Sequence, residues 1–298
     1  MTYIDIIKPV FPTILENEPL SRYTSFRVGG LAELFAKPEN INDFVFLVET
    51  CKEHSIPFVI LGDGSNTLVS DLGLRGVVIC TNGMNDIQML DNNRILAQTG
   101  AKLSKVAELA CNAGLAGFEF ASGIPGTVGG AIYMNAGAYD GTVGDFCESV
   151  TLYKDVFFEK PATGMEFGYR KSYIQNTDIL VVQAIFKLTP GNTEDIRTKM
   201  KDLNSRRRKT QPLEYPSAGS TFKRPEGYFA GKLIEDSGLK GFSVGGAQVS
   251  EKHAGFIINT GGATAGDIYS LIREVQKRVF EKFGVHLETE VRLLGFGE

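Results

Sequence analysis

The chain of 298 residues has no tryptophan, only four cysteines and only three histidines. Its cysteines lie far apart in the sequence and form no Cys-x-x-Cys pair. We therefore expect them to be small buried apolar side chains rather than parts of a zinc site or a disulfide framework. The histidines are equally scattered. The sequence therefore predicts no metal site.

Long hydrophobic runs and an excess of basic residues are also missing. No apolar stretch approaches the roughly 20 residues that span a bilayer, and the first residues include neither a basic start nor a signal-type apolar segment. The net charge of −4 argues against a general nucleic-acid surface. We therefore expect a cytoplasmic protein with no nucleic-acid partner and no membrane partner.

Glycine, by contrast, is abundant, with 34 copies where the usual share is about 7%. Residues 121–137 contain five glycines and no charged side chain. Glycine lets the backbone approach a ligand closely, and arrays of backbone amides near a helix N-terminus suit phosphate. The alternative is a tightly packed turn system that binds nothing.

A second glycine cluster strengthens the ligand interpretation. The apolar run Phe58–Leu61 is typical of a buried strand, and it leads into Gly62-Asp63-Gly64-Ser65-Asn66. This loop is neither a Walker loop nor the dinucleotide fingerprint, because it lacks the Gly-Lys-Ser/Thr of the first and the third glycine of the second. Two such loops in one fold indicate a long ligand with a pyrophosphate in its middle.

The periodicity of apolar residues predicts an α+β fold in two lobes. We expect helices at 41–53, 104–112, 229–236 and 267–283, and a further helix that is capped at Thr193 and ends in the basic run 206–209. We expect strands at 57–61, 74–80, 94–98, 149–154, 179–189, 255–259 and 286–294. The break Pro190-Gly191-Asn192 marks the predicted domain boundary.

Six short motifs, in order, carry a resemblance to a known family. They are Thr-Ser-Phe-Arg-Val-Gly-Gly at 24–30, Leu-Gly-Asp-Gly-Ser-Asn at 61–66, Ser-Gly-Ile-Pro-Gly-Thr-Val-Gly-Gly at 122–130, Phe-Gly-Tyr-Arg-Lys-Ser at 167–172, Ala-Gly-Ser-Thr-Phe-Lys at 218–223 and Leu-Glu-Thr-Glu-Val-Arg at 287–292. On these motifs the chain resembles the UDP-N-acetylenolpyruvoylglucosamine reductase (MurB) family. The short stretch between Arg170 and Ser220 resembles its second form, which lacks an extra loop over the substrate.

The resemblance implies a fold and an activity. It implies an FAD-binding domain of the vanillyl-alcohol-oxidase (PCMH) type at residues 1–190. A smaller α+β substrate-binding domain would follow at 191–298, with its C-terminal strand returning to the active site. It implies that NADPH reduces noncovalent FAD, which reduces the enolpyruvyl group of UDP-N-acetylglucosamine enolpyruvate to UDP-N-acetylmuramate in peptidoglycan synthesis.

The resemblance also implies three catalytic residues. Arg170 matches the arginine that stabilises a dianionic intermediate, Ser220 matches the proton donor, and Glu290 matches the third catalytic residue. The residues alone would equally suit a surface ion pair, an ordinary loop and a solvated strand face.

Cofactor and substrate contacts follow from the same motifs. Cofactor-binding residues are expected at Arg27, Gly62, Asp63, Gly64, Ser65, Asn66, Thr67, Leu68, Ser122, Gly123, Ile124, Gly126, Thr127, Gly129, Gly130, Asn135 and Gly137. Substrate-binding residues are expected at Arg206, Lys223, Arg224, Lys252 and His253. The basic run 206–209 also suits a solvated helix end, which leaves open which of its arginines meets a diphosphate. Arg224 stands where many family members have asparagine.

Two other functions remain open at this point. One is a flavin oxidase of the same broad fold acting on an alcohol or lactone. Such enzymes often attach FAD through histidine or cysteine, and neither residue occurs in the two glycine segments, which favours noncovalent FAD. The other is a nucleotide-binding module without catalysis, which would not need Arg170, Ser220 and Glu290 in these motifs.

Overall fold

The computed structural model describes residues 2–297, which form two compact units, each assembled from separated pieces of chain. The first unit contains the chain up to Ile14, Ala36–Gly62 and Ile79–Arg207. The second contains Leu15–Phe35, Asp63–Val78 and the chain from Arg208 onward. The last crossing between the units lies at 207/208, and the predicted domain boundary at 190 stays a prediction. The crossing lies at this point because α6 (Thr193–Thr210) is one continuous helix, and its residue Leu203 belongs to the core of the first unit.

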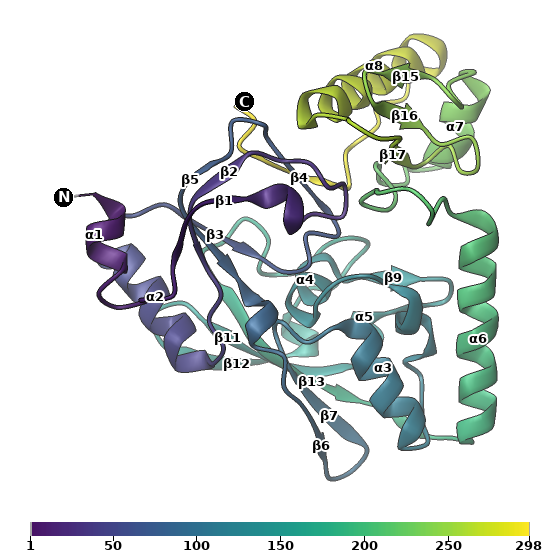
Figure 1. The fold of residues 1–298 in the computed structure, drawn as a ribbon. Coiled ribbons are helices and arrows are strands. Elements are labelled where there is room, and N and C mark those ends of the chain that lie inside the picture. The colour runs from purple at the N-terminus through teal and green to yellow at the C-terminus, as the bar shows by residue number, and fades with distance from the viewer. Residues whose placement is uncertain (1, 298) are drawn as a thin grey trace. The chain divides into compact units, whose positions relative to one another are not determined.

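The first unit is built on a five-stranded antiparallel sheet. Its strand order is β12 (Phe157–Pro161), β11 (Cys147–Tyr153), β13 (Leu180–Lys187), β7 (Arg94–Gln98) and β6 (Ile87–Leu90). Ala184 in the central strand pairs with Val150 on one side and with Ala97 on the other. The helices α3 (Leu103–Asn112) and α4 (Val128–Met134) pack on this sheet (Figure 1). The short helix α5 (Val143–Phe146) contacts α4.

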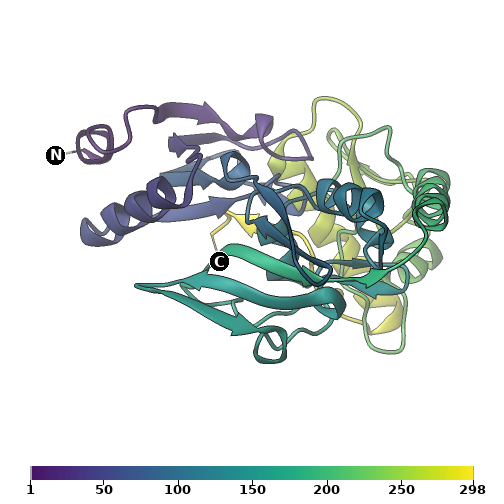
Figure 2. The ribbon, with the colours of Figure 1, turned by 90° about the horizontal axis from the view of Figure 1, so that it is seen from below.

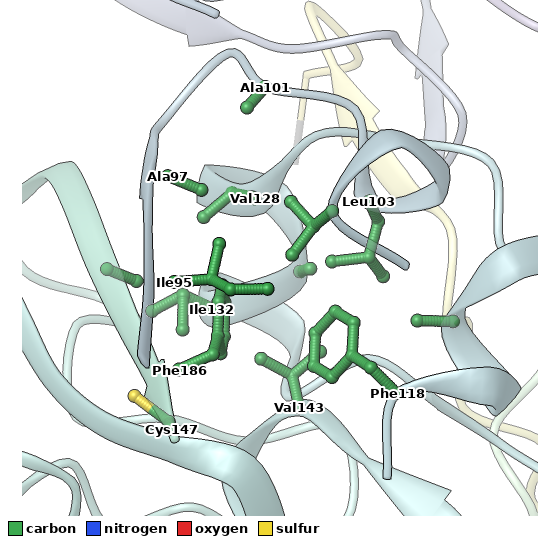
Figure 3. Close-up of a cluster of buried hydrophobic side chains, with 14 of the residues drawn as sticks. Ile95, Ala97, Ala101, Leu103, Phe118, Val128, Ile132, Val143, Cys147 and Phe186 are labelled. Carbon is green, nitrogen blue, oxygen red and sulfur yellow. The ribbon is translucent and has the colours of Figure 1, made fainter. Parts of the chain in front are cut away.

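The core of the first unit lies between the sheet and these helices. Figure 3 shows Ile95 of β7 and Phe186 of β13 beside Val128 and Ile132 of α4, all of them without exposed surface. Leu103 of α3 closes the same cluster. The glycine-rich segment is therefore anchored through its apolar residues.

Smaller elements complete the first unit. α1 (Tyr3–Ile7) lies beside α2 (Ile41–Glu53) in both ribbon views (Figures 1 and 2). The short strands are β3 (Phe58–Leu61), β8 (Leu115–Ala116) paired with β14 (Thr189–Pro190), and β9 (Gly137–Ala138) paired with β10 (Gly141–Thr142). All four cysteines are buried, as predicted.

The second unit combines pieces from both ends of the chain. β1 (Leu15–Pro19) pairs with β2 (Leu31–Ala36), and β5 (Leu74–Cys80) lies next to β2 in the same sheet. β4 (Thr67–Val69) runs parallel to β18 (Arg292–Leu294). A meander of β15 (Ser243–Val244), β16 (Ala247–Val249) and β17 (Ile257–Asn259) packs against α8 (Ala265–Phe283), which α7 (Ala230–Asp236) also contacts (Figure 1).

Helix α8 ends at the predicted residue and begins two residues before the predicted start at 267. The Thr264 hydroxyl accepts a hydrogen bond from Asp267 N, and the Asp267 carboxylate accepts one from Thr264 N, which with other hydrogen bonds holds the pKa of Asp267 below its usual value. Gly284 ends the helix in the left-handed region, with φ of 67°. The carboxylate of Asp71 additionally accepts hydrogen bonds from Ala265 N and Gly266 N. A loop between β4 and β5 thereby fastens the start of α8.

Three expectations about the elements were wrong. Thr193 is the first residue of α6 and not its cap, because Asn192 Oδ1 accepts hydrogen bonds from Glu194 N and Asp195 N, at distances of 2.9 and 3.2 Å. The expected strand at 286–294 is regular only over Arg292–Leu294. The glycine-rich segment 121–137, expected to be a loop, includes the helix α4.

No helix among residues 2–297 is long and apolar enough to cross a membrane.

Candidate active site

The glycine-rich segment of the first unit uses its own amides to hold α4. Val128 N donates to Ala101 O at 2.8 Å, and Gly129 N donates to Thr99 O at 2.7 Å. The Thr127 hydroxyl caps the helix by accepting from Gly130 N. The first three amides of α4 thus have acceptors within the protein. The expected contacts of these residues with a cofactor remain predictions.

Two consecutive glycines of α4 have different surroundings. A Cβ on Gly129 would overlap the hydroxyl of buried Thr99, so this position needs glycine for packing alone. A Cβ on Gly130 would only touch the Thr127 hydroxyl, at 3.7 Å. Gly130 therefore leaves room on its open side for something other than the protein. Gly130 is exposed, so this open side faces solvent.

Arg170 lies in a tight turn beside the end of the same segment. Gly168 and Lys171 exchange backbone hydrogen bonds of 3.1 and 3.2 Å across the turn, and Arg170 between them adopts a left-handed φ of 55°. Its guanidinium donates to Gly137 O at 3.4 Å. Asn135 accepts from Gly144 N and donates to Gly168 O, which fixes the turn against α4. A non-glycine residue held at positive φ stores strain, as residues at functional sites often do.

Helix α6 gives its arginines unequal environments. Ile196, Leu203 and Arg207 recur on the buried face at helical spacing, whereas Arg206 is exposed and pairs with Asp202 at 2.7 Å. Arg207 is half-buried, with its side chain next to Gly123. Burial lowers the pKa of Arg207. Among residues 2–297 no carboxylate forms an ion pair with Arg207. An anion bound there would offset the cost of burying its positive charge.

The same stretch of α6 also holds the start of the glycine segment. Asn204 donates to the Ser122 hydroxyl at 3.1 Å, and Leu203 O accepts from the Tyr139 hydroxyl at 2.8 Å. Asn204 was not among the predicted site residues, and the sequence left open which arginine of the basic run 206–209 meets a diphosphate. The spacing of buried residues along α6 is the signal that could have found Arg207.

In the second unit the Asp63–Asn66 loop packs on the first motif. Ser25 N donates to Gly64 O at 3.1 Å. Gly64 has a φ of 58°, and a Cβ there would overlap Tyr23 O, so only glycine fits. Arg27 also adopts a positive φ, of 57°, while Phe26 O accepts from the Asn259 amide at 3.0 Å. The segment around Arg27 and the Asp63–Asn66 loop, both predicted to bind the cofactor, thus pack against each other.

Ser220 and Glu290 lie on neighbouring backbone segments of this unit. Phe222 pairs with Thr289, and Glu290 N donates to Thr221 O at 2.8 Å, so the residue after Ser220 faces Glu290. Thr221 has no exposed surface; its amide donates to Gly255 O and its hydroxyl accepts from Ile257 N at 3.2 Å. Both predicted catalytic residues are half-buried. The second unit therefore brings these two together, while Arg170 belongs to the first.

The predicted substrate-binding residues of the second unit are engaged to different extents. Lys223 pairs with Glu288, and Lys252 pairs with Glu214 at 3.5 Å and donates to Arg208 O. Arg224 is exposed, with its guanidinium 3.9 Å from the centre of the Phe229 ring.

His253 accepts from Gly255 N through Nδ1, and burial lowers the pKa of its imidazole. Its ring is therefore neutral at pH 7 and presents an N–H only at Nε2. No group of three or more metal-ligating side chains occurs within residues 2–297.

Comparison with known proteins bears directly on this arrangement. Residues 211–294 match the C-terminal domain of UDP-N-acetylenolpyruvoylglucosamine reductase, and residues 32–155 match an FAD binding domain. A UDP-N-acetylenolpyruvoylglucosamine reductase of Caldanaerobacter subterraneus is 50% identical over 94% of this chain and 93% of its own length. One of Clostridium botulinum is 52% identical over 95% of this chain and 92% of its own length.

The chain belongs to the UDP-N-acetylenolpyruvoylglucosamine reductase (MurB) family. Its fold agrees with the assignment. The crystal structure of MurB from Thermus caldophilus has a TM-score of 0.79 and 34% identity, covering 94% of this chain and 98% of that one. The predicted fold class, an FAD-binding domain combined with the MurB C-terminal domain, is confirmed. The MurB C-terminal match falls entirely within the second unit, which holds Ser220 and Glu290.

The neighbouring glycines of α4 give a matched pair of variants. We expect Gly129→Ala to lower the free energy of unfolding by about 1–3 kcal/mol, because its Cβ overpacks against Thr99. Gly130→Ala should leave it unchanged or raise it slightly, since alanine favours a helix. Urea unfolding of the apoprotein measures both, and FAD titration then shows whether a Cβ at Gly130 blocks the cofactor. Equal destabilisation would contradict this assignment.

Proposed function

We propose that the chain catalyses the NADPH-dependent reduction of UDP-N-acetylglucosamine enolpyruvate to UDP-N-acetylmuramate, with noncovalent FAD as cofactor. The main support is the match to UDP-N-acetylenolpyruvoylglucosamine reductases at about half identity over almost the whole chain. The FAD binding domain match supports the cofactor. The same matches disfavour the oxidase alternative. The proposed setting is the cytoplasm, with small-molecule substrates and neither a nucleic-acid nor a membrane partner.

The residues suit FAD in the first unit, where Gly130 leaves room on its open side. In the second unit the Gly64 loop packs on Tyr23 and Ser25, and its contact with FAD rests on the family resemblance. We propose that the predicted cofactor-binding residues of both loops hold the flavin nucleotide. When bound, FAD accepts a hydride from NADPH and supplies it to the substrate.

Arg170 is the proposed electrostatic catalyst. The substrate alkene is conjugated to a carboxylate, so hydride addition at its terminal carbon drives a second negative charge onto that carboxylate. A guanidinium can hold both carboxylate oxygens at once. Its tight turn and its contact with Gly137 fix Arg170 in advance, which avoids the cost of reorganising at the moment of reaction.

Ser220 is the proposed proton donor, and Glu290 the third catalytic residue. After hydride addition the adjacent carbon carries the electron pair and must gain one proton, so that a hydride and a proton together saturate the double bond. The pairing of Thr221 with Glu290 supports a joint role, because it holds the two segments in a fixed register. We propose that Ser220 delivers the proton and that Glu290 acts beside it.

Arg207 is the proposed partner of a diphosphate, in place of Arg206. The support is its half-buried guanidinium, which pairs with no carboxylate among the described residues, against the exposed Arg206–Asp202 pair. A phosphate there would offset the cost of burying the charge.

The overall function is tested by mixing purified holoenzyme with NADPH, with and without the enolpyruvyl sugar. We expect NADPH to bleach the flavin absorbance under anaerobic conditions, and the sugar to restore it with formation of UDP-N-acetylmuramate. Rapid return of the absorbance with O₂ but not with the sugar would support an oxidase instead. A protein that binds no flavin would contradict both.

Replacing Ser220 separates proton delivery from hydride delivery. Ser220→Ala should leave bleaching by NADPH nearly intact, because that half-reaction needs no proton at the sugar. Return of absorbance with the sugar should slow by about 10²–10⁴-fold, the usual contribution of a positioned general acid. Stopped-flow absorbance measures both rates. A wild-type rate with the sugar would make Glu290 the leading candidate for the acid.

Arg207→Met and Arg206→Met form a matched pair on α6, because methionine keeps the apolar stem and removes the charge. We expect Arg207→Met to raise KM for the UDP-sugar by about 10–100-fold, the value of one or two charge-assisted hydrogen bonds. Arg206→Met should change it by less than about twofold, because exposed ion pairs contribute little. Steady-state kinetics with FAD titration decides. A fall in FAD affinity alone would assign Arg207 to the cofactor.

A further inference from the structure

The peptide of Glu290 is held on both of its hydrogen-bonding sides. Its N–H donates to Thr221 O at 2.8 Å, and its C=O accepts from the side-chain amide of Asn66 at 3.0 Å. Glu290 itself lies outside every regular strand, since β18 begins two residues later, at Arg292. These two hydrogen bonds therefore fix the backbone of Glu290, as the backbone hydrogen bonds of a sheet fix a strand residue.

Asn66 is placed for this contact by the strand pairing that follows it. β4 runs parallel to β18 with Thr67 opposite Arg292, and Arg292 N donates to Asn66 O at 3.0 Å. The backbone pairing stops at that bond. The Asn66 side chain continues it by one more hydrogen bond, to Glu290 O. One half-buried asparagine thus binds the backbone on both sides of Val291.

We propose that Asn66 is a positioning residue for Glu290, an inference that rests on the proposed catalytic role of Glu290. The amide of Asn66 holds the Glu290 carbonyl, and this fixes where the carboxylate of Glu290 starts from the backbone. The resemblance predicted Asn66 to be a cofactor contact. That contact stays a prediction, and the geometry directs the side-chain amide of Asn66 to the backbone of a proposed catalytic residue.

The contact matters because catalytic geometry tolerates little displacement. Without the amide, the Glu290 carbonyl loses its side-chain donor, and the segment between Thr221 and Arg292 gains freedom. A shift of about 1 Å in a reacting group can cost 10²-fold in rate. We therefore expect Asn66→Ala to slow return of the flavin absorbance with saturating sugar by about 10–100-fold.

A double-mutant cycle with Glu290→Gln separates positioning from a merely structural effect. The four holoenzymes (wild type, Asn66→Ala, Glu290→Gln and the double variant) are compared for that rate at equal flavin content. If Asn66 acts through Glu290, Asn66→Ala should slow the Glu290→Gln enzyme by less than about threefold, because interacting residues are non-additive. The same large factor in both backgrounds would overturn the inference.

Asn259 provides the matched control. Its side-chain amide also donates to a backbone carbonyl of the second unit, Phe26 O, at 3.0 Å, and no contact joins it to Glu290 among the described residues. Asn259→Ala should therefore change the rate by the same factor with Glu290 or Gln at position 290. Non-additivity as large as that of Asn66 would show that the cycle reports general destabilisation, and would overturn the inference.

The remaining outcomes are also decisive. Glu290→Gln at the wild-type rate would remove the catalytic role of Glu290, whereas a slow Glu290→Gln with additive Asn66→Ala would remove only the positioning role. If Asn66→Ala loses flavin, Asn66→Asp, which keeps the size and removes the donor, enters the same cycle. Loss of flavin in both variants would assign Asn66 to the cofactor and overturn the inference.

Discussion

The second unit depends on the hydrogen bonds made by one buried residue, Thr221. Its amide reaches Gly255, its hydroxyl reaches the start of β17, and its carbonyl reaches Glu290. Three stretches of chain that are distant in the sequence therefore meet at one residue. A buried backbone group without a partner costs about 1–3 kcal/mol, so each of these bonds resists separation of the segments. The hydrogen bond from Glu290 N to Thr221 O holds Glu290 beside the residue that follows Ser220.

In the first unit, the glycines of α4 serve both close packing and open backbone surface. A glycine-rich stretch is typical of a ligand-binding loop. At the start of α4, however, the backbone amides donate hydrogen bonds to Thr99 O, Ala101 O and the Thr127 hydroxyl. Packing explains Gly129, while Gly130 retains space that the protein does not fill. Close packing and ligand approach therefore coexist in adjacent residues. The residue type alone does not distinguish them, because both uses require the absence of a Cβ.

Local signals predicted local structure well. α2 follows its apolar period, and α8 follows its capping box and terminal glycine, because these devices act within a few residues. Helix α4 could not be predicted in this way, since glycines weaken a helix and Val128 and Ile132 hold it through the core. The family and the fold class were predicted from six motifs, while the site residues stay predictions. The pairing of Thr67 with Arg292 depends on tertiary contacts that no short window contains.

The division of the chain also constrains the order in which the protein can be made. The second unit includes Leu15–Phe35 and Asp63–Val78 from the first third of the sequence. Most of its residues, however, lie in the segment that starts at Arg208. At a synthesis rate of about 5–20 residues per second, the earliest of these pieces leaves the ribosome roughly 10–40 s before Arg208 is added. During that interval β1, β2, β5 and β3 can form their sheet, but β4 lacks its partner β18. Nascent chains of this protein therefore carry the unpaired edge of β4 until β18 has been made, and an exposed strand edge favours the binding of chaperones.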